Sequence, residues 1–141
     1  MSFEFCDHTA DIAFEAFGAD LPDLFKSAAD AFLATLIFNP EAVEPKISRQ
    51  MESCHQDVEF LLHGFLEELV FWKDAEGLLL QVMEIRITKS GGRFLLKASA
   101  HGEVVDPVRH EQRADVKAVT FHKFKVEEVT DGWRCYVILD V

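Results

Sequence analysis

The sequence predicts an α+β fold, as one two-layer domain over residues 1–141 in which two helices pack on a mostly antiparallel sheet. The chain has 141 residues, which suits one domain and is too short for two ordinary ones. Two stretches carry apolar side chains at helical spacing, while most others alternate apolar and polar residues as strands do. Short turns join the strands after the second helix, and short connections favour antiparallel pairing.

The first elements are predicted to be two strands followed by a helix. Strand-like alternation covers residues 3–6 and 12–17. A helix begins after Asp20, a suitable N-cap, and has Pro22 in its first turn, where the missing N–H of proline is harmless. The pair at 39–40, Asn-Pro, stops the apolar run.

A strand over residues 47–54 and a second helix follow. This helix begins near Asp57 and ends at Gly77. Gly64 lies within it, where glycine costs about 1 kcal/mol relative to alanine. We therefore expect close packing against a neighbour at Gly64.

The remainder of the chain is predicted to be a meander. Strands over 83–88 and 94–104 flank a turn at 90–92, Ser-Gly-Gly. After a polar loop, residues 116–129 read as one strand with a bulge, because its apolar positions change phase halfway along. The last strand, 133–141, carries apolar side chains at both parities and is therefore expected to be an inner strand.

Charge and composition exclude several classes of protein. The net charge of −11 argues against a general RNA or DNA binder, because phosphate contacts need Lys and Arg. Residues 86–125 nevertheless hold nine basic and four acidic side chains, a pattern more typical of docking on a protein than of gripping RNA. Three scattered cysteines, the lack of a signal-peptide pattern and the absence of a membrane-length apolar run predict a cytoplasmic protein without membrane contact.

A polar pentad near the start, Asp7-His8-Thr9-Ala10-Asp11, is the first candidate site. Its carboxylates suit hard cations such as Ca²⁺ and Mg²⁺, and its imidazole suits Zn²⁺ or Mn²⁺. The alternative is a turn in which Asp7 and Asp11 accept hydrogen bonds from nearby backbone N–H groups.

The end of the chain is the second candidate. If the last strand is ordered, Asp140 and the α-carboxylate of Val141 lie close together, and like charges repel unless a cation or a donor lies between them. The alternative is that both project into water, where the repulsion is screened.

Lys117 is the third candidate. It shares parity with Val119 and Phe121, which predicts a position on the covered face near a strand start. A lysine there needs a carboxylate partner, or it extends its ammonium group to solvent from the strand end. The sequence carries no phosphate-binding glycine loop, Gly-x-Ser-x-Gly elbow or His-Glu-x-x-His motif.

Three segments together resemble the archease family: residues 7–12, residues 116–122 and residues 137–141, in this order and with the last at the chain end. Gly102-Glu103 ahead of Arg109-His110 agrees as well, so the resemblance covers the whole chain. It implies an accessory protein of the RtcB-type RNA ligase, which acts in tRNA splicing and RNA repair. Such a protein is not an enzyme: it promotes guanylylation of the ligase and its multiple turnover, and contacts RNA at most weakly or indirectly.

The resemblance also implies roles for particular residues. A divalent cation, calcium as usual in the family or else manganese or magnesium, is held by Asp11, Asp140 and Val141. The functional lysine of the family falls on Lys117, so that Asp11, Lys117 and Asp140 are the ligase-activating residues. The family commonly has tyrosine where this chain has Phe121, which removes a hydroxyl group expected near Lys117.

Two other functions compete with this interpretation. One is a small metal-dependent hydrolase that uses a cluster made of Asp7, His8, Asp11 and Asp140. It would need a cleft with a metal-bound water and a nearby base. In the activator, Asp7 and His8 lie next to the ligands instead. The second is a general chaperone, which would show a broad apolar or a contiguous basic surface.

Overall fold

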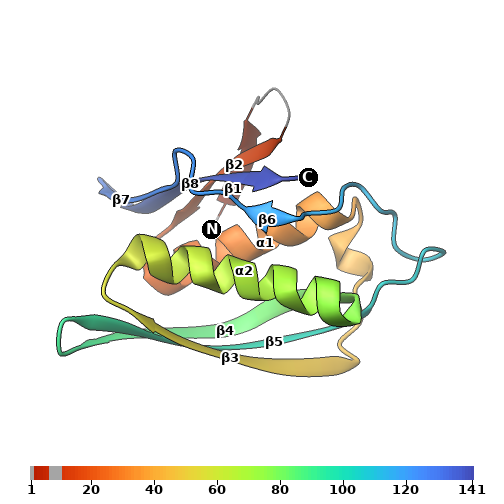
Figure 1. Cartoon of the computed structure of the whole chain (residues 1–141), viewed down its shortest axis with the longest axis horizontal. Coiled ribbons are helices and arrows are strands. Elements are labelled where there is room, and N and C mark those ends of the chain that lie inside the picture. Colours follow the sequence, from red (N-terminus) through yellow and green to blue (C-terminus); the bar gives the residue numbers. More distant parts are fainter. Residues whose placement is uncertain (1, 7–10) are drawn as a thin grey trace.

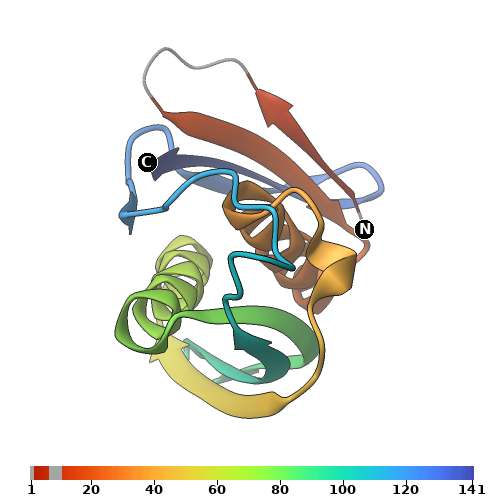
Figure 2. The same ribbon diagram turned by 90° about the vertical axis from the view of Figure 1, so that its right-hand side faces the viewer.

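The chain forms three layers, with both helices between two antiparallel sheets (Figures 1 and 2). This computed structural model describes residues 2–6 and 11–141. The predicted α+β class is confirmed, but the expected two-layer arrangement on one sheet is wrong, because the strands form two separate sheets.

The first sheet contains both ends of the chain. Its central strand is β8 (Gly132–Asp140), which pairs on one side with β2 (Ile12–Gly18), and β2 in turn pairs with β1 (Ser2–Cys6). The other side of β8 is shared by two short strands, β6 (Ala118–Val119) and β7 (Lys125–Val129). The last strand is therefore an inner strand, as its apolar residues of both parities predict.

The second sheet is formed by the middle of the chain. Its order is β3 (Ile47–His55), β5 (Arg93–Val104) and β4 (Leu78–Ser90). Gly91 and Gly92, both with positive φ, form the turn between β4 and β5. Strand β4 begins before the predicted strand and is interrupted by a register shift between Val82 and Glu84.

Both helices begin after the predicted N-caps and α2 ends at the predicted glycine, because these residues are suited to their positions, whereas α1 ends at Leu36, before the Asn-Pro pair at 39–40. Helix α1 (Leu21–Leu36) begins after Asp20, whose carboxylate accepts the Asp23 N–H at 2.9 Å. Helix α2 (Val58–Glu76) begins after Asp57 and ends at Gly77, which takes the left-handed conformation with φ 65°. A short 3₁₀ helix (Pro40–Ala42) follows α1. Within the described residues, no helix is both long enough and apolar enough to span a membrane.

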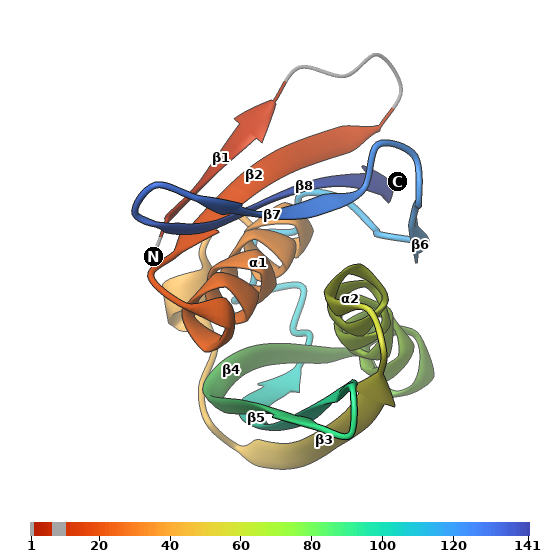
Figure 3. The ribbon, with the colours of Figure 1, turned by 90° about the vertical axis from the view of Figure 1, so that its left-hand side faces the viewer.

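Helix α1 explains why a second sheet is needed. It lies against β2 of the first sheet and against β4 of the second, with α2 beside it (Figure 3). Its buried side chains cover most of its circumference: Leu24, Phe25, Ser27, Ala28, Ala29, Ala31, Phe32, Leu33, Thr35 and Leu36. A helix that is apolar nearly all round must be covered from several sides. The strand patterns show that each strand has a covered face, but they do not show how many sheets the strands form.

The close packing expected at Gly64 is not found within the chain. A methyl group at this position would meet the Nε2 atom of His55 at 3.4 Å, which is an ordinary contact. Nothing else in the fold explains the glycine.

The predicted single strand over 116–129 is wrong. It is divided into β6 and β7, which pair with successive parts of β8. From Ala118 to Lys125 the chain advances seven residues, while the paired positions on β8 run four residues, from Asp140 to Tyr136. Three residues are therefore extra. Any odd number changes the phase of the apolar positions, so the sequence pattern could not distinguish this loop from a one-residue bulge.

A buried carboxylate, Glu103, ties the segment after β5 to the connection between α1 and β3. Glu103 is 3% exposed and accepts the backbone N–H of Glu44 at 2.7 Å. Arg109 donates to its second oxygen, and Nε2 of His110 lies 3.1 Å from the first. The Nδ1 atom of His110 accepts the Asp106 N–H at 2.8 Å, so the ring proton is on Nε2, facing Glu103.

These donors decide the charge of Glu103. Burial raises the pKa of its carboxyl group, but the hydrogen bonds from Glu44, Arg109 and His110 outweigh burial and lower the pKa to about 2. The group therefore stays ionised in the folded protein when it is already protonated in the unfolded chain.

This lowered pKa predicts a specific acid sensitivity. Between the ordinary value of 4.5 and about 2, the unfolded state binds a proton that the folded state does not, so stability falls as the pH falls through this window. We expect Glu103→Gln to lower the urea midpoint at about pH 6. Between about pH 6 and about pH 3, the urea midpoint of this variant should fall less than that of the parent chain. Glu52→Gln, an exposed substitution on β3, is the matched control. An equal fall of the urea midpoint in Glu103→Gln and in the parent chain would contradict the lowered pKa of Glu103.

Candidate functional site

The pairing of β2 with β8 brings two candidate ligands together from opposite ends of the chain. The pairing ends with Ile12 opposite Leu139, and Asp11 and Asp140 are the residues that adjoin this pair at the same end of the two strands. Both aspartates are partly exposed. Two aspartates separated by nearly the whole sequence thus lie at the same end of the first sheet.

Strand β6 brings Lys117 to the same end. The Lys117 N–H donates to the carbonyl oxygen of Asp140 at 2.8 Å, and Ala118 pairs with Asp140. The chain end lies beside β6 (Figure 1). The backbones of Lys117 and Asp140 therefore lie side by side, with Val141 as the next residue.

The side chain of Lys117 does not occupy the covered face. Lys117 is exposed, whereas Val116 is fully buried and Val119 is 4% exposed. The parity argument fails because β6 is only two residues long, so alternation does not extend back to Lys117. Its ammonium group is accordingly available to solvent at the strand start, which is the alternative that the sequence left open.

The outer edge of β6 is held by α2. The N–H of Val119 donates to Oε1 of Glu67 at 3.1 Å, and Nε2 of His63 lies 2.7 Å from the Val119 carbonyl oxygen. The Phe121 ring stacks on the His63 ring, with centroids 3.7 Å apart and an interplanar angle of 12°. Phe121 therefore contacts α2 through its ring. Sequence reasoning missed His63 and Glu67, because their i,i+4 spacing is common on any helix.

The donor set at the strand ends is made of oxygens. Among residues 2–6 and 11–141, no three His, Cys, Asp or Glu side chains are grouped closely enough to hold a metal ion. The predicted set of Asp11, Asp140 and the Val141 carboxylate takes its third charge from the backbone end, so it is not such a group. Hard divalent cations, Ca²⁺, Mg²⁺ and Mn²⁺, fit these donors better than softer ions. The predicted contributions of Asp7 and His8 lie outside the described residues.

A cavity elsewhere in the molecule does not involve these candidates. It has a volume of about 360 Å³ and lies near the C-terminal ends of both helices. Its walls include Leu36 of α1, Lys73 of α2 and Asp115. The Nζ atom of Lys73 donates to Asp115 at 2.6 Å and to the Val116 carbonyl at 2.6 Å. Neither Asp11 nor Asp140 lines this cavity, so it does not correspond to the hydrolytic site of the competing hypothesis.

Comparison with known proteins gives one consistent family. A sequence model of the Archease protein family (MTH1598/TM1083) matches residues 3–141. "Protein archease" of Pyrococcus abyssi is 40% identical over 140 residues, covering 99% of this chain and 98% of that protein. The Thermococcus kodakarensis "Protein archease" is 39% identical with the same coverage.

Two solved structures share the fold. The solution structure of Methanobacterium thermoautotrophicum protein 1598 aligns with a TM-score of 0.87 and 35% identity, over 99% of this chain and 98% of that one. A Thermotoga maritima crystal structure, described as an archease and possible chaperone, aligns with a TM-score of 0.62 and 21% identity, over 96% and 94%. The second likeness concerns the fold alone.

The strand-end site predicts cation binding that depends on the chain end. We expect one divalent cation per chain, measured by calorimetry with Ca²⁺. Two residues added after Val141 should weaken binding, because they remove the terminal charge and crowd the site. Asp131→Asn, at the other end of β8, is the matched control and should bind as the parent chain does. Equal affinity in the extended and parent chains would refute this ligand set.

Proposed function

The chain belongs to the archease family, and from this premise we propose that it is a non-enzymatic activator of an RtcB-type RNA ligase. In this role it acts in the cytoplasm during tRNA splicing and RNA repair. It promotes guanylylation of the ligase and its multiple turnover. It presents a divalent cation, held by carboxylates, to the ligase.

The observation that carries this proposal is the register of β2 with β8, whose last pair, Ile12 and Leu139, adjoins Asp11 and Asp140 at one sheet end. A cation held at partly exposed strand ends is accessible to a large partner. A hydrolase instead needs its cation in a cleft that holds a substrate and a base. The geometry therefore favours presentation to a protein over the competing hydrolase.

Each candidate residue has a distinct part in this proposal. Asp11, Asp140 and the Val141 carboxylate would hold the cation, which when bound supplies positive charge for stabilising phosphate oxygens. Lys117 places its ammonium group beside the same strand ends, where it can pair with a carboxylate or with a phosphate of GTP. Asp7 is proposed to lie next to the ligands, together with His8.

The basic segment does not provide a contiguous face for RNA. Arg86, Lys89, Arg93 and Lys97 lie on β4 and β5 of the second sheet. Lys117, Lys123 and Lys125 belong to the part of the chain that borders the first sheet, on the other side of the helical layer. The positive charges of residues 86–125 are thus divided between two sides of the molecule, which supports a protein partner.

The proposal predicts that activation is lost before stability. We expect Asp11→Ala, Lys117→Ala and Asp140→Ala to abolish most stimulation of ligase guanylylation. The melting temperature without metal should hold, or rise slightly in the two aspartate variants, because carboxylate repulsion is relieved. Asp131→Ala and Lys125→Ala are the matched controls. Three folded variants that stimulate the ligase like the parent chain would rule out the proposed mechanism.

The divided basic charge predicts weak RNA binding. With a net charge of −11, the chain should bind a generic tRNA with a dissociation constant weaker than micromolar at about 0.15 M salt. Fluorescence anisotropy with labelled tRNA measures this directly. Sub-micromolar binding would show that direct RNA contact had been underestimated.

A further inference from the structure

Strand β6 is two residues long and lies at the edge of its sheet, so the backbone groups on its outer side have no neighbouring strand to bond to. On one side, bonds to β8 flank it: the Lys117 N–H donates to Asp140, and the Thr120 N–H donates to Ile138 at 3.0 Å. On the other side the Val119 N–H and carbonyl point away from β8. Val119 is 4% exposed, so water cannot easily satisfy them.

Helix α2 satisfies both groups with side chains. Glu67 accepts the Val119 N–H, while His63 donates to the Val119 carbonyl through Nε2, since a carbonyl oxygen can only accept. These two bonds imitate those of a neighbouring strand. The opposite face of α2 is fixed in the core by Leu61, Leu62 and Phe65, which are at most 1% exposed. The edge of β6 is therefore attached to a rigid part of the molecule.

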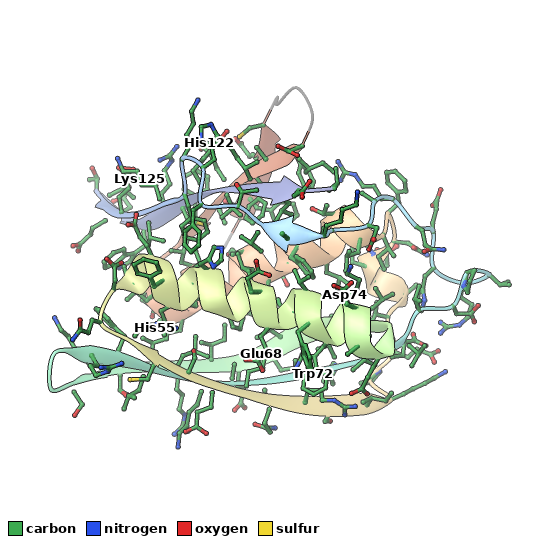
Figure 4. All side chains as sticks on the ribbon, in the orientation of Figure 1. His55, Glu68, Trp72, Asp74, His122 and Lys125 are labelled. Atoms are coloured by element: carbon green, nitrogen blue, oxygen red, sulfur yellow. The ribbon has the colours of Figure 1, made fainter. Side chains whose placement is uncertain are left out.

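Aromatic rings cover the bond from His63. Phe121 stacks on one face of the imidazole, and Phe124 meets it at 5.5 Å with an interplanar angle of 72°. The His63 side chain is only 12% exposed as a result. Figure 4 shows the loop and β7, marked by His122 and Lys125, passing over α2 on this side. The loop that separates β6 from β7 thus shields the attachment from water, which strengthens a hydrogen bond.

We propose that His63 and Glu67 are positioning residues for the strand-end site, an inference that rests on the function proposed above. By holding Val119 they keep β6 against the end of β8. This fixes Lys117, two residues earlier, beside Asp140. Neither residue touches the cation or the ligase: each acts through the backbone of β6. The position of Lys117 relative to the carboxylates then depends on α2 as well as on the first sheet.

The test uses Glu67→Ala and its conservative counterpart Glu67→Gln in the full chain. Alanine removes the acceptor for the Val119 N–H, whereas glutamine retains an acceptor oxygen at the same place. Glu68→Ala is the matched control, because it removes the same charge from the next residue of α2. Figure 4 places Glu68 with Trp72 on the side of α2 toward the second sheet, away from β6.

The first readout is hydrogen exchange of the Lys117 and Thr120 amides, which report the docking of β6 on β8. We expect about tenfold faster exchange in Glu67→Ala, as the loss of one hydrogen bond of ordinary net strength produces. Calcium affinity, from calorimetry, should fall several-fold, and stimulation of ligase guanylylation should fall with it. Glu67→Gln should restore all three measurements, and Glu68→Ala should leave them unchanged. If Glu67 contributed only to global stability, Glu67→Ala would lower the melting temperature without a specific loss of calcium affinity and ligase stimulation.

A second variant, His63→Leu, removes the donor to Val119 and should reproduce the effects of Glu67→Ala. Faster exchange in Glu67→Ala with unchanged calcium affinity and unchanged stimulation would overturn the positioning role while leaving the proposed function intact. Unchanged exchange would overturn it outright. If the parent chain fails to stimulate the ligase, the proposed function fails. Faster exchange with weaker calcium binding would then still support positioning of the cation site by α2.

Discussion

The candidate site depends on one constraint, the register between β2 and β8. That register is fixed at the far end of the two strands by a close approach of glycines. A Cβ atom on Gly132, whose φ is 146°, would lie 2.2 Å from the carbonyl oxygen of Gly18. With this end closed, a slip of one residue would also move every side chain of β8 to the wrong face. The backbone contact at the other end thus fixes the position of β8, and with it the place of Asp140 at the same sheet end as Asp11.

The three-layer arrangement lets the two halves of the molecule carry different tasks. The first sheet holds the chain ends and the candidate ligands, while the second sheet completes the cover of the helices, which pack against both sheets. Helix α2 links these tasks, because Leu61 and Leu62 are buried in the core while His63 and Glu67 reach the edge of β6. Core packing and site geometry are thus joined through a few polar side chains on one helix.

Local features of this fold could be predicted from the sequence, and non-local ones could not. The caps at Asp20, Asp57 and Gly77 act within a few residues, and the double parity of β8 reports its central position directly. Neither the number of sheets nor the division of 116–129 can be predicted from local sequence. Alternation of apolar and polar residues shows which face of a strand is covered, but not which element covers it. The place of Asp11 and Asp140 at the same sheet end depends on pairing across nearly the entire chain, so the residues alone left it open, and resemblance to a family suggested it. The attachment of Val119 to α2 has no sequence signal, because His63 and Glu67 bond to the backbone N–H and carbonyl of Val119, which every residue type except proline carries.

The composition of the proposed site bears on how it would work. Calcium in proteins takes about six to eight oxygen ligands, and magnesium about six. With each bound through one oxygen, two aspartates and one terminal carboxylate supply three ligands, which is only part of either shell. The remaining positions would face solvent at the strand ends, where water or a partner's oxygen can occupy them. An incomplete shell would be a weakness in a structural metal site, which is usually closed. For a protein that presents a cation to another protein, the open positions are where the partner's phosphate or carboxylate oxygens would bind.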